Sequence, residues 1–345
     1  MATRTSDQVL RQKRRPRVSP VHVLGFIFVA VIVVWLGTNL IDDPTHFLDL
    51  TILGLTIGMV YALIALGYSL VYGILELINF AHGDVFMLGG MMTVTLVSAF
   101  GLGASGSVLV WIIPMLAIAA VFTGVINITI ETVAYRPLRS APRLAPLITA
   151  IGVSFILQTV GLVWKGPAPV SIRDDILPRS EIFHIGQATL SWNQLIVWIV
   201  TIPTLLVLVW LVQKTKSGKA MRAVAQDKDA AAMMGIDVNR TISFTFLIAG
   251  CLAGFAGVLY ALFATNVQFD TGFRLGLFAF TAAVLGGIGN LPGAVLGGLL
   301  IGLVRSLGSA YLDERWTNAL VFAILITILI FRPQGLLGAR AKEKV

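Results

Sequence analysis

The sequence has little charge and almost no cysteine. Of its 345 residues, 12% are charged and 57% are hydrophobic. A soluble domain has about 25% charged and about 45–50% apolar residues, so these proportions exclude an ordinary soluble core and are typical of a chain that crosses a membrane several times. Cys251 is the single cysteine, so the chain has no cysteine pair for an internal disulfide or a metal site.

Motifs for catalysis and for nucleotide binding are also missing. The four histidines are scattered, and neither an H-E-x-x-H pattern nor a G-x-x-x-x-G-K-[ST] phosphate loop occurs. The longest segments between apolar stretches, 165–192 and 213–240, are 28 residues each, too short for a catalytic domain. We therefore expect no enzyme activity, no catalytic residues, no metal and no cofactor bound by this chain.

Ten apolar stretches are candidates for membrane crossing, since a spanning helix needs about 20 mostly apolar residues. They are 21–41, 49–73, 84–100, 107–130, 145–164, 194–212, 241–263, 274–289, 292–311 and 317–331. The sequence predicts an all-α integral membrane protein of about ten transmembrane helices, within a range of about eight to ten. Short or broken helices are expected among them, because 274–289 and 317–331 are short and 84–100 starts in a polar segment.

The basic residues predict the orientation, because Lys and Arg collect in cytoplasmic loops. Counting alternately from a cytoplasmic N-terminus places 19 of the 25 Lys and Arg residues inside, in 4–17, 132–144, 213–240 and 332–344. We therefore expect both termini in the cytoplasm and a multi-pass protein of a bacterial inner membrane. The net charge of +8 is explained by these short segments, and no nucleic-acid partner is expected.

Segment 213–240 is a basic loop that also has helix-forming composition. Residues from Gly218 to Met234 are rich in Ala, Met, Lys and Arg, and Gly235 is placed to end a helix. One interpretation is an ordinary cytoplasmic loop. The other is a coupling helix, pushed by a motor domain, in which three small residues, Ala230 to Ala232, permit close approach.

Asp229-Ala230-Ala231, followed after three residues by Gly235, resembles the EAA-x-x-x-G signature of ABC importer permeases, with Asp in place of Glu. Five further segments are similar to the LivH-type permease of the branched-chain amino acid ABC transporter family. They are 61–90, 131–139, 147–158, 283–303 and 329–338. The resemblance covers about 49–338. Around this permease domain, we expect a basic tail at 1–20, an extra transmembrane helix and outer loop at 21–48, and a cytoplasmic tail at 339–345.

The resemblance implies the membrane-spanning subunit of an ATP-driven importer for branched-chain or related amino acids. It implies four partner chains: a second, LivM-like permease, two cytoplasmic ATP-binding subunits that hydrolyse the ATP, and a periplasmic binding protein that delivers substrate. A urea or short-amide permease of the same family is the alternative. A stand-alone channel or ion-coupled carrier is the alternative of a different class, although such a carrier is expected to hold intramembrane acids.

Polar residues interrupt the apolar body at 75–84. The residues are Glu76, Asn79, His82, Gly83 and Asp84. One interpretation is a cytoplasmic turn in which Gly83 breaks the helix and Asn79 and Asp84 cap the helix ends. The other is a broken helix that lines the substrate pathway with free backbone groups.

Glycines spaced four apart predict close helix packing, either within this chain or between permease subunits. The pairs are Gly250/Gly254, Gly293/Gly297 and Gly298/Gly302. Arg305 lies within an apolar stretch where, by the resemblance, relatives often carry an acid. We expect it either to extend outward to the membrane surface or to pair with Asp313 or Glu314 there, as a structural residue or as a substrate contact. Segment 165–192 is either a solvated connector or the surface that docks the binding protein.

Overall fold

The computed structural model describes residues 30–31, 34–101, 108–139, 141–142, 144–172, 181–185 and 188–338. The chain divides into two compact units, 1–44 and 45–345. The predicted tails at 1–20 and 339–345 lie outside the described residues, as does most of the apolar stretch 21–41. The unit of residues 45–345 carries the features that concern function.

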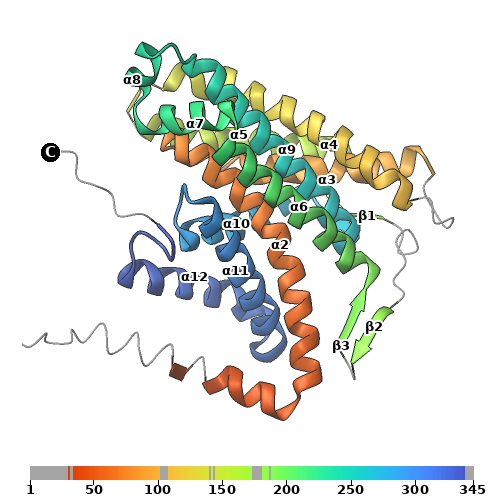
Figure 1. Ribbon diagram of the computed structural model, residues 1–345. Helices are drawn as coiled ribbons and strands as arrows, with labels where there is room; N and C mark the ends of the chain where they lie inside the picture. The colour runs from red at the N-terminus through yellow and green to blue at the C-terminus, as the bar shows by residue number, and fades with distance from the viewer. Residues whose placement is uncertain are drawn as a thin grey trace, which may run out of the picture. The chain divides into compact units, whose positions relative to one another are not determined.

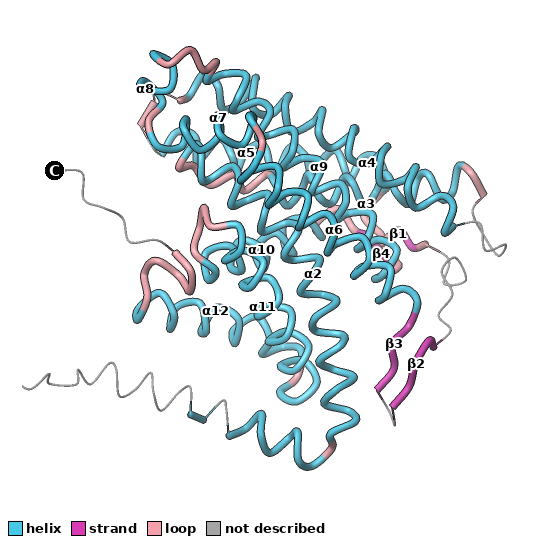
Figure 2. The backbone as a smooth tube through the Cα atoms, viewed as in Figure 1, coloured by secondary structure: helices cyan, strands magenta, loops and turns pink. Residues whose placement is uncertain are grey.

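Helices make up most of this unit (Figures 1 and 2). The long ones are α2 (Pro44–Leu75), α3 (His82–Ala99), α4 (Val108–Ile130), α5 (Leu144–Lys165), α6 (Trp192–Lys214), α9 (Val238–Ala264), α10 (Thr271–Gly286), α11 (Leu291–Leu312) and α12 (Glu314–Phe331). Each apolar stretch predicted from residue 49 onward overlaps one of them. Long apolar runs dictate helices here because lipid offers no partner for backbone N–H and C=O groups.

Seven helices of the described residues are long and apolar enough to cross a membrane. The two exceptions among the long helices are α10, which has 16 residues, and α3, whose His82, Asp84 and glycines lower its mean hydropathy. The all-α membrane class is confirmed, whereas the count of ten crossings is not established by these helices.

Short strands accompany the helices. β1 (Val170–Ser171) pairs antiparallel with β4 (Asn266–Val267), and β2 (Glu181–Ile185) forms a hairpin with β3 (Ala188–Ser191). No strands were expected from the sequence. The β1–β4 pairing joins residues nearly a hundred positions apart, so no local pattern signals it.

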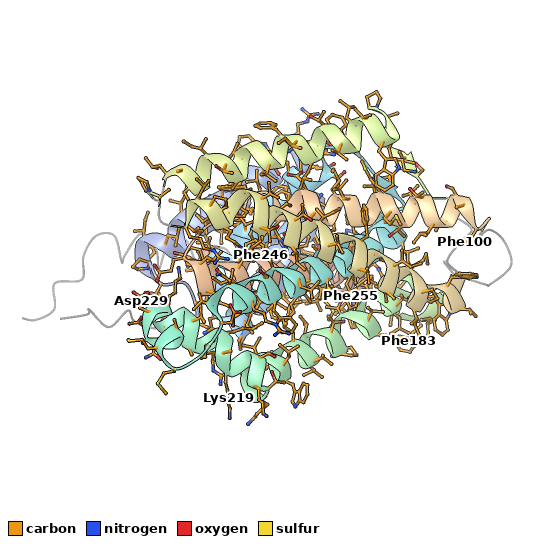
Figure 3. The ribbon with its side chains drawn as sticks, turned by 90° about the horizontal axis from the view of Figure 1, so that it is seen from above. Phe100, Phe183, Lys219, Asp229, Phe246 and Phe255 are labelled. Carbon is orange, nitrogen blue, oxygen red and sulfur yellow. The ribbon has the colours of Figure 1, made fainter. Side chains whose placement is uncertain are left out.

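The helix bundle of residues 45–345 has two distinct ends. At one end, α7 (Lys216–Gln226) and α8 (Lys228–Met233) connect α6 to α9. Lys219 and Asp229 mark this end in Figure 3, and Phe100 and Phe183 mark the opposite one. We call them the α8 end and the strand end.

Small residues bring α2 and α11 into direct backbone contact. A Cβ atom added at Gly298 would lie 2.6 Å from the Cα of Ala62, and one added at Gly302 would overlap the backbone of Gly58. Without side chains between them the two helices approach closely, which adds dispersion contacts along the crossing. The other glycines of the predicted pairs also face backbone of this chain: Gly250 and Gly254 face α4, and Gly293 and Gly297 face α10.

Candidate functional site

The connection between α2 and α3 enters the protein interior. Residues 76–81 are not helical, and Glu76, at φ +56°, is exposed at the surface. Asn79 and all residues from Ala81 to Asp84 are buried. Gly83 packs on the backbone of Gly272 and Gly276 of α10. The chain thus turns back from the end of α2 and starts α3 among buried neighbours.

The predicted capping by Asn79 and Asp84 is wrong. The residue before α3 is Ala81, and no side chain caps the helix. Asp84 instead accepts a hydrogen bond from the Ser154 hydroxyl of α5, and Asn79 Oδ1 accepts one from the Tyr135 hydroxyl at 2.8 Å. Both polar groups therefore bond to helices that are distant in sequence, which a local pattern could not reveal.

These side chains form a buried polar cluster. The His82 ring meets the Tyr68 ring edge to face at 4.9 Å, and Gln158 donates to Ser154 at 3.2 Å. Among the described residues, neither Asp84 Oδ1 nor Asn79 Nδ2 has a hydrogen-bond partner. A buried polar atom without a partner costs about 1–3 kcal/mol, so these two atoms are exceptions among the buried polar groups of a folded protein.

The α8 end presents two short helices. The Thr215 hydroxyl accepts from Gly218 N at 3.1 Å at the start of α7, and Asp227 Oδ1 accepts from Ala230 N at 3.0 Å at the start of α8. Gly235 has φ +82°, and the next N–H, of Ile236, donates to the Ala231 carbonyl at 3.1 Å. This glycine turn fixes the end of α8, as the sequence predicted for Gly235.

The two faces of α8 differ. Ala231 is buried against the rest of the chain, whereas Asp229 and Ala232 are exposed. The largest apolar groups on the outer face are Met233 and Met234, which are 82% and 83% exposed. From the sequence, Ala231 was expected to be among the small residues that a motor domain approaches, and the two methionines were given no role of their own. Adjacent exposed methionines beside charged residues are typical of a surface that a partner covers.

A buried carboxylate lies near the same end. Glu131 is fully buried at the start of a π-helical turn, η1 (Glu131–Tyr135), which leads into a 3₁₀ turn, η2 (Arg136–Leu138). It pairs with Arg136 at 2.9 Å and with Arg139, and it accepts from the Ser243 hydroxyl at 2.7 Å. Arg139 also donates to Asn239 at 2.5 Å. The network therefore ties the end of α4 to the first turns of α9, which follows α8.

Removing this charge should destabilise the protein. Glu131→Gln removes the carboxylate from Arg139, whose side chain is 16% exposed, and from Arg136, whose side chain is 40% exposed. Loss of these charge-assisted hydrogen bonds costs about 1.5–3 kcal/mol. We expect a melting temperature several degrees lower in detergent. The control is Asp270→Asn, which breaks an exposed pair with Arg274 that is worth about 0–1 kcal/mol. Equal melting temperatures for the two variants would contradict a structural role for Glu131.

A cavity opens between helices toward the strand end, where Arg305 of α11 lines it. Its volume is about 810 Å³. The Arg305 guanidinium donates to the Tyr61 hydroxyl and lies over the rings of Tyr61 and Phe278, at 5.9 and 5.2 Å. Among the described residues no ion pair joins Arg305 to Asp313 or Glu314, although Glu314 lines the same cavity and attracts the guanidinium from farther away. The α2 and α10 rings that hold Arg305 are distant in sequence, and local spacing gave no sign of them.

Comparison with known proteins decides the family. The sequence matches the family described as branched-chain amino acid transport system / permease component over residues 50–329. The chain belongs to this family. This permease is 40% identical over 311 residues to the high-affinity branched-chain amino acid transport system permease protein LivH of Escherichia coli K12, covering 87% of this chain and 98% of that protein.

Two further relatives agree. The permease is 38% identical over 303 residues to the high-affinity branched-chain amino acid transport system permease protein BraD of Pseudomonas aeruginosa, covering 87% of this chain and 98% of BraD. It is 30% identical over 303 residues to a probable branched-chain amino acid transport permease protein LivH of Methanocaldococcus jannaschii, covering 81% and 89%. The resemblance to LivH-type permeases is confirmed, and the chain is a multi-pass membrane protein.

Proposed function

We propose that this permease is the membrane-spanning subunit of an ATP-driven importer for branched-chain amino acids, placed in a bacterial inner membrane with the α8 end in the cytoplasm. The observation that supports it most is the match to relatives named for this transport along 98% of their length. The basic residues of α7 and α8 favour the orientation, because Lys and Arg collect on the cytoplasmic side.

The proposed partners follow from the family to which the chain belongs and from the ATP-binding motif that its sequence lacks. The chain has no phosphate loop, so ATP must be hydrolysed by other chains. We assign two cytoplasmic ATP-binding subunits to the α8 end, a second permease beside the bundle, and a periplasmic binding protein to the strand end. Segment 165–192, which contains β1, β2 and β3, is our candidate for docking the binding protein.

In the proposed mechanism, movement passes from α8 through α9 to the end of α4. A motor subunit moves α8, which the Asp227 cap and the Gly235 turn hold as a rigid unit. Because α9 starts directly after α8 and is bonded to Glu131 and Arg139, the movement passes to the end of α4. The polar cluster of Asn79, His82 and Asp84 then lies on the pathway that opens between α2, α3, α5 and α10.

Uptake measurements test the proposal. A strain lacking this chain should regain uptake of radiolabelled L-leucine when the chain is supplied together with its cognate binding protein. Uptake should stop on ATP depletion and persist in the presence of a protonophore. Uptake of urea without leucine would favour the urea or short-amide alternative, and abolition by the protonophore with ATP maintained would favour an ion-coupled carrier.

A further inference from the structure

Arg305 is a charge placed inside a helix of the bundle. It lies seven residues before the end of α11. A guanidinium costs about 2.5–3.5 kcal/mol at the centre of a spanning helix and less toward its ends, and an intramembrane charge is a candidate functional site unless a carboxylate neutralises it. In the described part of the chain, no carboxylate lies within ion-pair distance of Arg305, and Glu314, which lines the same cavity, attracts the guanidinium only from farther away. Tyr61 accepts one of its five N–H donors, and the Tyr61 and Phe278 rings stabilise the cation without removing its charge.

The cavity beside Arg305 has the volume and the lining residues expected of a small-molecule binding site. Ligand cavities measure about 300–1,000 Å³ and combine apolar walls with a few polar groups. This one, of about 810 Å³, is lined by aromatic residues of α2, α9 and α10, among them Tyr260 and Phe263. Its other charged residues are Arg274, which is paired with Asp270 at 3.1 Å, and Glu314, which is exposed at the start of α12.

We propose that this cavity is a transit site for a zwitterionic amino acid, with the carboxylate on Arg305, the ammonium group toward Glu314 and the aliphatic side chain against Phe263 and Phe278. The planar guanidinium matches a carboxylate in a two-point hydrogen bond. Urea and short amides carry no carboxylate, so the site selects amino acids over them. This inference rests on the proposed importer function and names the group that the substrate must carry.

Cysteine labelling tests the site without relying on transport. In the assembled complex, with Cys251→Ala as background, Ser309→Cys places a thiol on the cavity wall. We expect an anionic methanethiosulfonate to label this thiol faster than a cationic one of similar size. Arg305→Gln should lower the ratio of the anionic to the cationic labelling rate about tenfold, because the positive charge of Arg305 attracts the anionic reagent. Arg315→Gln, a control at an 89% exposed side chain that does not line the cavity, should leave the ratio unchanged.

Protection and uptake complete the test. L-leucine should slow labelling of Ser309→Cys, whereas L-leucinamide and urea at the same concentration should not, and Arg305→Gln should abolish the protection. L-leucine uptake by Arg305→Gln should fall about tenfold, with a higher KM. Arg305→Lys should retain part of the uptake, since Lys keeps the positive charge but lacks the planar pair of N–H donors that matches a carboxylate.

Two outcomes would overturn the site. Leucine protection that survives Arg305→Gln would show that the carboxylate binds elsewhere, and unchanged leucine uptake by that variant would remove the site from the pathway. Failure of the importer function would look different. In that case wild-type protein would show no ATP-dependent leucine uptake, while the labelling ratio and its dependence on Arg305 would persist.

Discussion

A chain that carries Met233→Glu and Met234→Glu together is expected to reach the membrane in normal amount and to lose ATP-dependent uptake. Both methionines are more than four-fifths exposed, so the change should leave the fold intact. If a motor subunit covers the two methionines, the glutamates that replace them must be buried there without charge partners. A residue at the centre of an interface contributes about 2 kcal/mol or more to binding, so the change should weaken the interface by at least that amount. Since about 1.4 kcal/mol corresponds to a tenfold change in affinity, uptake should fall at least about tenfold.

The matched control is Met233→Leu with Met234→Leu, which keeps two flexible apolar side chains at the same positions. This control should retain most of the uptake. The measurements are leucine uptake, the amount of chain in the membrane and the amount of ATP-binding subunit that co-purifies. Normal uptake by the glutamate variant would remove α8 from the coupling surface.

Gly302→Leu is expected to prevent the chain from accumulating as a folded protein. A side chain at this position collides with the backbone of Gly58, which no rotamer change can relieve. Separating α2 from α11 should cost about 3 kcal/mol or more, at the upper end for overpacked sites. The yield of monodisperse protein in mild detergent, measured by size-exclusion chromatography, checks the prediction.

Gly152→Leu is the matched control, because a Cβ atom there meets nothing within 4 Å and the residue is exposed on α5. Its folded yield should equal that of the unmodified chain. The sequence left open whether these glycines pack within the chain or between permease subunits. Equal yields for Gly302→Leu and Gly152→Leu, with loss only of the second permease, would assign Gly302 to the interface between subunits.

Helix positions followed from the sequence because the lengths of apolar runs decide them. The prediction of 49–73 became Pro44–Leu75, and that of 292–311 became Leu291–Leu312. Gly235 was also placed correctly at the end of α8, since a left-handed residue favours glycine wherever it occurs. Local chemistry is enough for features of this kind.

Features that depend on distant partners did not follow. Asp84 looked like a helix cap because its own neighbours allow that role, but its partner, Ser154, is 70 residues away. Ala231 looked available for a partner protein, although the docking of α8 on its own chain buries it. Arg305 was expected to pair with the nearby acids Asp313 or Glu314, whereas its guanidinium donates a hydrogen bond to the Tyr61 hydroxyl, 244 residues away. The partners of these three residues depend on which helices pack together. Local sequence patterns do not show that packing.

The measurement that tests the central claim most directly is purification of this chain from its native membrane in mild detergent, with identification of the proteins that remain bound. The account predicts a P-loop ATP-binding subunit and a second multi-pass permease, and it predicts that the Met233→Glu, Met234→Glu variant loses the ATP-binding subunit. Recovery of the chain alone, or of a homo-oligomer that moves leucine without ATP, would contradict it.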